Sequence, residues 1–291
     1  MAVGNSEDLD GRPPPLDNLT AGPDQSPRPM RPKGMKNHDE EIRKQFTVQA
    51  ARFSEQGLTL SSAEYLQWVV NQLGLNPSFV VLDVAAGTGH LGRAIATHVQ
   101  RVVAVDLTPA MIAEGQREAV RAGLGNITFE QGRAEKLPFP DNSFDMVVTR
   151  LSLHHFADTQ PAVREMARVC KPGCQVGIMD MISPDDAALD VSYNRLERLR
   201  DPSHTRCLTR EELHRGMEDA GLKVVQIVAR DIEVDLARWL DMTNTGPEAR
   251  RIIQDELTQE LQGSRITGMR PFMRNDRLMF TQTWVTAVGV K

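Results

Sequence analysis

The sequence has few cysteines, no long apolar run and no excess of positive charge, and each shortage narrows what the protein can be. Its three cysteines are an odd number in 291 residues, which argues against a disulfide framework and for a reducing compartment. No apolar run approaches the roughly 20 residues of a membrane-spanning helix. The formal net charge of -5 argues against a nucleic-acid or anionic-membrane surface. We therefore expect a cytoplasmic protein without a membrane span and without a nucleic-acid partner.

The first 36 residues differ in composition from the rest of the chain. Seven of the 17 prolines lie between Pro13 and Pro32, where large apolar residues are almost absent. Burial in such a segment cannot offset the entropy lost on ordering, so we predict a disordered tail over residues 1–36. Residues 37–291 are assigned to one folded domain. It is expected to begin with helices over residues 37–74, capped by Asn37 and by Ser61 or Ser62.

From residue 79 onwards, apolar runs typical of strands alternate with helical patterns. This alternation predicts an α/β fold with a parallel sheet and helices on both faces. The predicted strands cover residues 79–84, 101–106, 126–130, 144–149, 174–181 and 224–228. Residues 236–275 look helical and irregular. The alternating stretch 280–288 is predicted to close the sheet as an edge strand.

One stretch combines a buried strand with a glycine turn. The apolar run from Val80 to Val84 leads into Gly87-Thr88-Gly89 and then into a helix-forming segment. A strand, a glycine turn and a helix in this order gather backbone N–H groups at one point, which suits a nucleotide-like ligand. Asp106 follows 19 positions after Gly87, at the end of the next strand. A carboxylate there can accept hydrogen bonds from both hydroxyls of a ribose.

Two ligands fit this pattern. The spacing Gly87-x-Gly89-x-x-Gly92 matches the dinucleotide fingerprint, which favours NAD. Asp83, four residues before Gly87, favours S-adenosylmethionine (SAM) instead. A carboxylate beside an anionic pyrophosphate costs energy, whereas the same carboxylate attracts the ammonium and sulfonium of SAM.

With these residues in place, the chain resembles the class I SAM-dependent methyltransferases. Within them it is similar to the methyltransferase type 11 group, which includes the ubiquinone/menaquinone C-methyltransferases. The motifs that carry the resemblance lie at residues 81–89, 105–111, 134–139, 144–145, 153–156 and 168–173. The resemblance covers roughly residues 40–230. It implies a Rossmann-like, seven-stranded, mostly parallel sheet whose last strand is antiparallel.

The resemblance also implies a cofactor site. Its residues would be Asp83, Ala85, Gly87, Gly89, Asp106, Leu107, Ala134, Glu135 and Arg150. In this set, Asp83 would face the SAM ammonium, Asp106 the ribose and Leu107 the adenine, and Arg150 would line the pocket near the methionine end. Arg133 departs from the family, which often has an acid there, and this leaves open how the adenine amino group is bound.

The candidate catalytic residues are His154 and His155, just after the fourth predicted strand. Ligands of open α/β sheets gather at this edge, and histidine titrates near neutral pH, so either could be a general base, with His155 preferred. The alternative is that one histidine packs and the other caps the next segment. Cys170 and Cys174 are four residues apart without further ligands nearby, so no metal site is expected.

The residues thus predict a SAM-dependent methyltransferase acting on carbon, oxygen or nitrogen of a small molecule. In the family, the region that matches residues 185–208 often covers the substrate, and residues 236–275 are expected to do the same. The stretch 193–206 is basic, which fits an acidic or phenolic acceptor, although it also fits a solvated helix face. The alternatives are a SAM-fold enzyme with a non-methylating reaction and an NAD-dependent oxidoreductase.

Overall fold

The computed structural model describes residue 40, residues 42–47 and residues 62–291. The predicted tail, the Asn37 cap and Ser61 lie outside the described residues. Residues 40 and 42–47 are helical, and helix α2 (Ala63–Gln72) begins after Ser62, as predicted. No helix among the described residues combines the length and the apolar character that a bilayer crossing requires.

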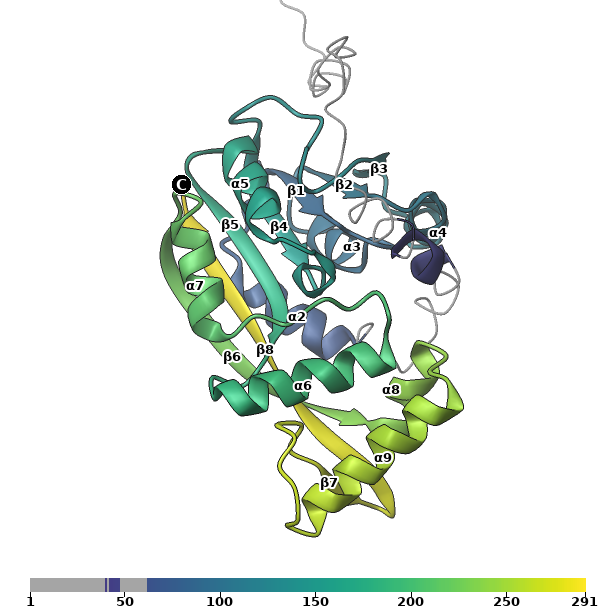
Figure 1. The fold of residues 1–291 in the computed structure, drawn as a ribbon. Coiled ribbons are helices and arrows are strands. Elements are labelled where there is room, and N and C mark those ends of the chain that lie inside the picture. The colour runs from purple at the N-terminus through teal and green to yellow at the C-terminus, as the bar shows by residue number, and fades with distance from the viewer. Residues whose placement is uncertain (1–39, 41, 48–61) are drawn as a thin grey trace, which may run out of the picture.

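A mostly parallel sheet runs through the centre of the molecule (Figure 1). Its strand order is β3-β2-β1-β4-β5-β8-β6, and β7 pairs with β8 outside this path. The strands are β1 (Val80–Val84), β2 (Arg101–Asp106), β3 (Ile127–Gln131), β4 (Phe144–Arg150), β5 (Cys170–Ile182), β6 (Lys223–Asp235), β7 (Phe272–Arg274) and β8 (Arg277–Val290). Strands β1 to β5 pair in parallel, whereas β8 is antiparallel to its neighbours. The predicted seven-stranded sheet with an antiparallel last strand is confirmed, with the short β7 in addition.

The prediction that residues 280–288 form an edge strand is wrong. Strand β8 lies between β5 and β6, so β6 forms this edge of the sheet. Residues Val285 to Val288 are all buried. The alternation of apolar and polar residues suggested that one face of this strand is exposed to solvent. In the structure, polar side chains of β8 are buried and form hydrogen bonds inside the protein. Gln282, for example, is 3% exposed and donates to Glu197.

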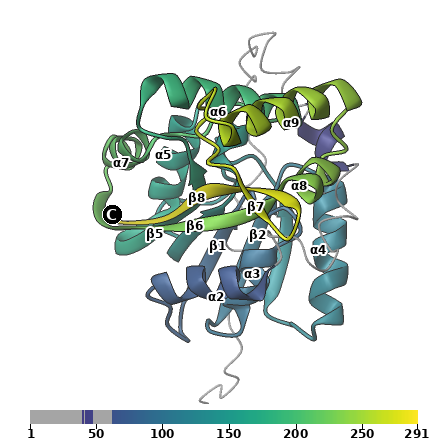
Figure 2. The same ribbon diagram turned by 90° about the horizontal axis from the view of Figure 1, so that it is seen from below.

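Helices cover both faces of the sheet, as predicted (Figure 2). Helices α5 (Gln160–Val169) and α7 (Arg210–Glu218) pack on one face. On the other lie α2, α3 (His90–Ala96) and α4 (Pro109–Arg121). The two faces carry separate apolar clusters with the strands between them, which is the layered arrangement that fixes the carboxyl ends of the parallel strands at one edge.

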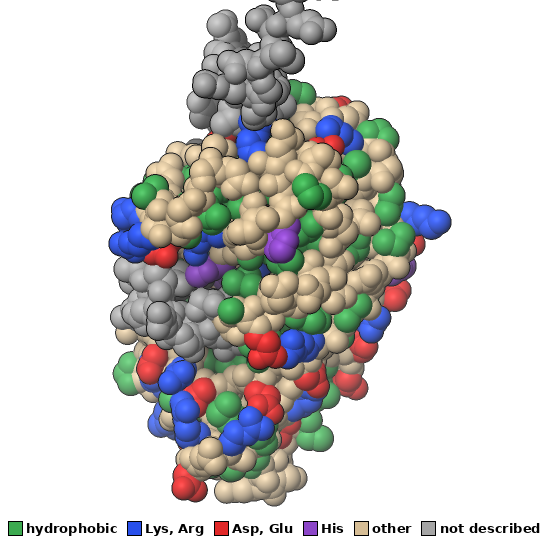
Figure 3. Space-filling view, turned by 180° about the vertical axis from the view of Figure 1, so that it is seen from behind, with side chains coloured by type: hydrophobic (Ala, Val, Ile, Leu, Met, Phe, Trp, Pro, Cys, Tyr) green, Lys and Arg blue, Asp and Glu red, His purple; other side chains and the backbone are tan. Residues whose placement is uncertain are grey.

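Strands β6 and β8 extend beyond the parallel strands and carry a third apolar cluster. Helices α6 (Ala187–Arg200), α8 (Leu236–Met242) and α9 (Pro247–Leu261) pack there. At this lower end of the molecule, acidic and basic side chains intermingle on the surface that Figure 3 shows. Arg270, for example, pairs with Asp231 of β6 at 2.9 Å.

Candidate active site

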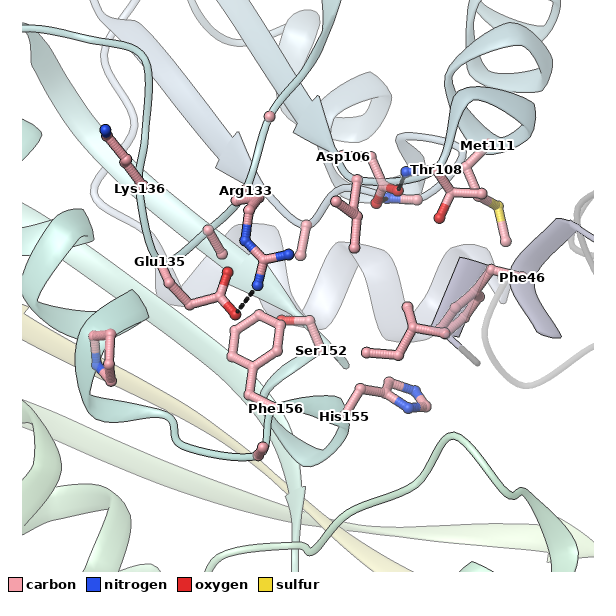
Figure 4. A pocket seen from close by; sticks show the side chains of 18 of the residues that line it. Phe46, Asp106, Thr108, Met111, Arg133, Glu135, Lys136, Ser152, His155 and Phe156 are labelled. Atoms are coloured by element: carbon pink, nitrogen blue, oxygen red, sulfur yellow. Dashed lines mark hydrogen bonds and ion pairs between the residues drawn. The ribbon is translucent and has the colours of Figure 1, made fainter. Parts of the chain in front are cut away.

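Two neighbouring cavities lie at the carboxyl ends of β1, β2 and β4. The larger has a volume of about 290 Å³ and the smaller about 90 Å³. Both are lined by Phe46, Gly87, Leu151 and His155, which therefore form the boundary between them. Figure 4 shows the larger cavity, with Phe46 and His155 side by side at one end. A crevice at this edge is where open α/β sheets bind their ligands.

The turn after β1 shapes the cavity wall through its backbone. Ala85, Gly87 and Gly89 have φ angles of 52°, 57° and 77°. A Cβ on Gly87 would meet nothing within 4 Å, so the missing side chain leaves the cavity open at this point. A Cβ on Gly89 would lie 2.8 Å from the Phe129 ring. Ala85 and Gly87 line the larger cavity, whereas Gly89 lines neither and serves close packing instead.

Asp106 ends β2 and faces the larger cavity. Its Oδ2 accepts a hydrogen bond from the Gly87 amide at 2.7 Å, and its Oδ1 accepts one from the Thr108 amide at 2.8 Å. Burial raises the pKa of Asp106, and these two amides counteract that effect. These hydrogen bonds hold Asp106 in one orientation, and its carboxylate faces the cavity as an acceptor.

Asp83 lies in β1, is 1% exposed and lines the smaller cavity. Its Oδ2 accepts a hydrogen bond from the Gly92 amide at 2.8 Å. Its Oδ1 is buried and has no hydrogen-bond partner among the described residues. Burial raises the pKa of Asp83 to about 7, although the charge of Arg150 opposes this. An orphaned carboxylate oxygen at a cavity wall is costly unless a cation or donor binds there.

The larger cavity is also lined by Leu107, Ala134 and Glu135. Glu135 forms an ion pair with Arg133, 3.0 Å between Oε1 and Nη2, which Figure 4 shows as a dashed line. Where the family often has an acid before Ala134, this chain has Arg133, but it has an acid after Ala134, namely Glu135. The Glu135 carboxylate lies in the cavity wall.

Arg150, at the end of β4, lines the smaller cavity. Burial lowers its pKa to about 10, against the charges of Asp83 and Asp180. Its guanidinium carbon lies 5.7 Å from the centre of the Trp284 ring. Arg150 remains charged at neutral pH.

His155 and His154 occupy the short 3₁₀ helix Leu153–His155 after β4. His155 lines both cavities and packs edge-on against Phe46, with 4.9 Å between ring centres. Its Nδ1 lies 3.1 Å from the carbonyl oxygen of Ser203. Burial lowers the pKa of His155 to about 4, and the neighbouring His154 contributes. His155 is therefore neutral at pH 7, and an Nδ1–H that donates to Ser203 leaves the basic lone pair on Nε2.

His154 has a different environment. Its Nδ1 lies 2.6 Å from Oδ1 of Asp180, and both side chains are buried. Burial disfavours the imidazolium, but the charge and hydrogen bond of Asp180 outweigh it and raise the pKa of His154. Two adjacent histidines thus have pKa values displaced in opposite directions, an arrangement typical of sites that separate acid and base roles.

Apart from Gly89, every predicted site residue lines one of the two cavities. Four residues of the site were not singled out from the sequence: Phe46, Asp180, Asp201 and Ser203. Asp180 had a signal, because it ends an apolar run in a predicted strand. Asp201 and Ser203 lie in the predicted covering segment 185–208, but nothing in the sequence marked them individually. Phe46 had no signal, since it comes to the site from a distant segment.

Comparisons with known proteins show which family this chain resembles. Residues 81–173 match the family model described as a methyltransferase domain. The chain is 36% identical over 187 residues to an uncharacterized methyltransferase of Bacillus subtilis, YcgJ, covering 64% of this chain and 74% of YcgJ. The crystal structure of YcgJ superposes with a TM-score of 0.73 at 31% identity, covering 79% of this chain and 99% of that one.

A further relative is the ubiquinone/menaquinone biosynthesis C-methyltransferase UbiE of Ectopseudomonas mendocina. It is 33% identical over 162 residues, which span 53% of this chain and 63% of UbiE. The strand order, the glycine turn at the carboxyl end of β1 and the similarity to YcgJ lead to the same result. The chain belongs to the SAM-dependent methyltransferase family.

Proposed function

We propose that this protein transfers a methyl group from SAM to a small-molecule acceptor, with the adenosine part of SAM in the larger cavity and its methionine end in the smaller. The observation that carries the proposal is Asp83 Oδ1, a buried carboxylate oxygen without a partner among the described residues. The ammonium of SAM supplies the cation that this oxygen lacks. An anionic dinucleotide pyrophosphate would increase the cost of burying Asp83.

The larger cavity fits an adenosine. Asp106 has lone pairs for both ribose hydroxyls, because its two backbone hydrogen bonds use only part of its accepting capacity. The open space beside the α-carbon of Gly87 lets the ligand approach the backbone. Leu107 and Met111 provide apolar surface in the same cavity, with Glu135 at its polar end.

The chemistry needs little from the protein beyond positioning. Bound SAM supplies a methyl group on a sulfonium, which makes that carbon a strong electrophile. The chain holds acceptor and cofactor in line, which can contribute about 7–11 kcal/mol to the rate. When the acceptor atom carries a proton, neutral His155 accepts it on Nε2 while Nδ1 remains bound to Ser203. A lowered pKa makes His155 a weak base, so its contribution lies at the low end of the about 10²–10⁴-fold typical of general-base catalysis.

The predicted covering segments reach the smaller cavity, where the methyl group of SAM would meet its acceptor. Arg200 and Asp201 at the end of α6, together with Met242 at the end of α8, form part of its wall. The predicted covering segments, residues 185–208 and 236–275, thus both contribute to this cavity. The similarity to UbiE, named as a C-methyltransferase, supports an acceptor of quinone-precursor type methylated on carbon.

The test is to incubate the purified protein with methyl-labelled SAM and a small-molecule extract, and to follow the label by chromatography and mass spectrometry. We expect a labelled small molecule and an equal amount of S-adenosylhomocysteine (SAH). A matched reaction with Asp106→Ala should lose the label. Product formation without SAH would instead indicate a non-methylating reaction, and no binding of SAM or SAH in calorimetry would refute the proposal.

A further inference from the structure

Arg200 is a buried cation in the wall of the smaller cavity. It ends helix α6, and its side chain is 6% exposed. The guanidinium carbon lies 4.8 Å from the centre of the Trp239 ring, and Nε donates a hydrogen bond to the Trp239 carbonyl oxygen at 3.2 Å. These two contacts fix the plane of the guanidinium. Arg200 is therefore a rigid group rather than a mobile surface charge.

The hydrogen bonds of this guanidinium are incomplete. Nη2 is buried and has no hydrogen-bond partner among the described residues. Nη1 lies 3.8 Å from Oε2 of Glu197, which is beyond hydrogen-bond distance. Oε2 of Glu197 also lacks a partner in the described chain. Leaving a charged donor unsatisfied in the interior is destabilising, so a retained orphan at a cavity wall indicates a ligand atom.

The groups around the smaller cavity leave Arg200 available for an anion of the acceptor. His154 is paired with Asp180 at 2.6 Å and adds no net charge. Asp201 accepts hydrogen bonds from the Ser203 amide and hydroxyl, and Asp83 is the partner proposed for the cofactor ammonium. The methionine end of SAM also brings a carboxylate, and Arg150, in the same wall, can pair with it. Arg200 then faces the acceptor, and a negative group there complements its charge.

We propose that Arg200 binds a negatively charged oxygen of the methyl acceptor, so that the acceptor is a small molecule with a carboxylate or an acidic phenolic or enolic hydroxyl. This inference rests on the proposed methyltransferase function. A guanidinium in the same cavity wall as His155 serves both kinds of acceptor. It forms a charge-assisted hydrogen bond to a carboxylate, and it stabilises the oxyanion that remains when His155 takes the proton of a hydroxyl.

The test uses matched pairs of probes that differ in charge. Benzoate and benzamide, and 4-nitrophenol and nitrobenzene, are measured by ligand-observed NMR against full-length protein saturated with SAH. We expect the acidic member of at least one pair to bind at least about tenfold more tightly than its neutral counterpart, as one charge-assisted hydrogen bond allows. Arg200→Gln should abolish this preference, and Arg200→Lys should retain part of it because the charge remains.

Arg198→Gln is the matched control. Arg198 lies on the same helix, is exposed and lines neither cavity, so its replacement should leave the preference unchanged. Calorimetric SAH binding by each variant shows that it is folded. Equal binding of acidic and neutral probes by the wild type, or an unchanged preference in Arg200→Gln, would overturn the inference. Absence of SAH binding to the wild type would instead contradict the proposed function.

Discussion

Asp83→Asn should change the proton balance of cofactor binding. The pKa of Asp83 is raised to about 7 by burial, so the carboxyl is about half protonated at pH 7 in the ligand-free protein. A cation within about 4–6 Å lowers a carboxyl pKa by about 1–3 units. Binding of the SAH ammonium therefore releases a proton wherever Asp83 was protonated.

The magnitude follows from linkage. With a free pKa of about 7 and a bound pKa of about 5, SAH binding releases about 0.8 proton at pH 6, about 0.5 at pH 7 and about 0.1 at pH 8. The sign makes binding tighter as pH rises, by about tenfold between pH 6 and pH 8. Titration calorimetry in two buffers of different ionisation enthalpy measures the released protons at each pH.

Asp83→Asn keeps the acceptor for the Gly92 amide but cannot titrate. Its proton release should fall to the small contribution of the ligand amine, and its SAH affinity should fall and lose most of its pH dependence. The same linkage affects the stability of the ligand-free wild type. As the pH rises from about 4 to 7, the folded state keeps the Asp83 proton that the unfolded state has already released, so the free energy of unfolding falls. Asp83→Asn should therefore melt at a higher temperature than the wild type at pH 8. His155→Gln is the control, and it should release protons like the wild type. Unchanged proton release in Asp83→Asn would refute the reasoning, since another group would then be titrating.

Three further predictions concern the neighbouring residues. Asp106→Ala should weaken SAH binding at least about a hundredfold, since two charge-assisted hydrogen bonds to the ribose are lost; an unchanged dissociation constant in calorimetry would contradict the assignment. His155→Gln should lower turnover of a hydroxyl acceptor by about 10²-fold, the low end of the typical range since its pKa is low, with little change in SAH affinity; wild-type turnover would make His155 a packing residue. Ala85→Gly should raise the melting temperature by about 2 °C, because it relieves a left-handed alanine. Ala86→Gly, at a position without positive φ, should lower it.

Much of the site was predictable because its signals are local. The strand β1, the glycine turn and Asp106 lie within 27 consecutive residues, Val80 to Asp106, and parallel strands bring their carboxyl ends to one edge regardless of other details. The capping box of Thr209 and Glu212, with both reciprocal hydrogen bonds present, is a local feature of the same kind. Backbone conformation and hydrogen bonding between near neighbours dictate these features.

The environment of each histidine was not predictable in the same way. The sequence proposes both His154 and His155, with only a slight preference for His155, yet Asp180 pairs with one and Ser203 with the other across 26 and 48 residues of chain. Their pKa values diverge only because these partners and the surrounding burial differ. No periodic pattern encodes which of two adjacent side chains will meet a distant carboxylate.

The sequence alone therefore determined the order of strands and helices, the glycine turn and the two carboxylates of the proposed cofactor site, because periodicity, turn chemistry and capping act over a few residues. The tertiary structure alone decided that β8 lies inside the sheet and that Phe46 stands between two cavities. It also decided that the Arg200 guanidinium is fixed over Trp239 with one nitrogen left without a partner in the described chain. These features depend on contacts between segments distant in the sequence, and those contacts are set by the packing of the whole chain.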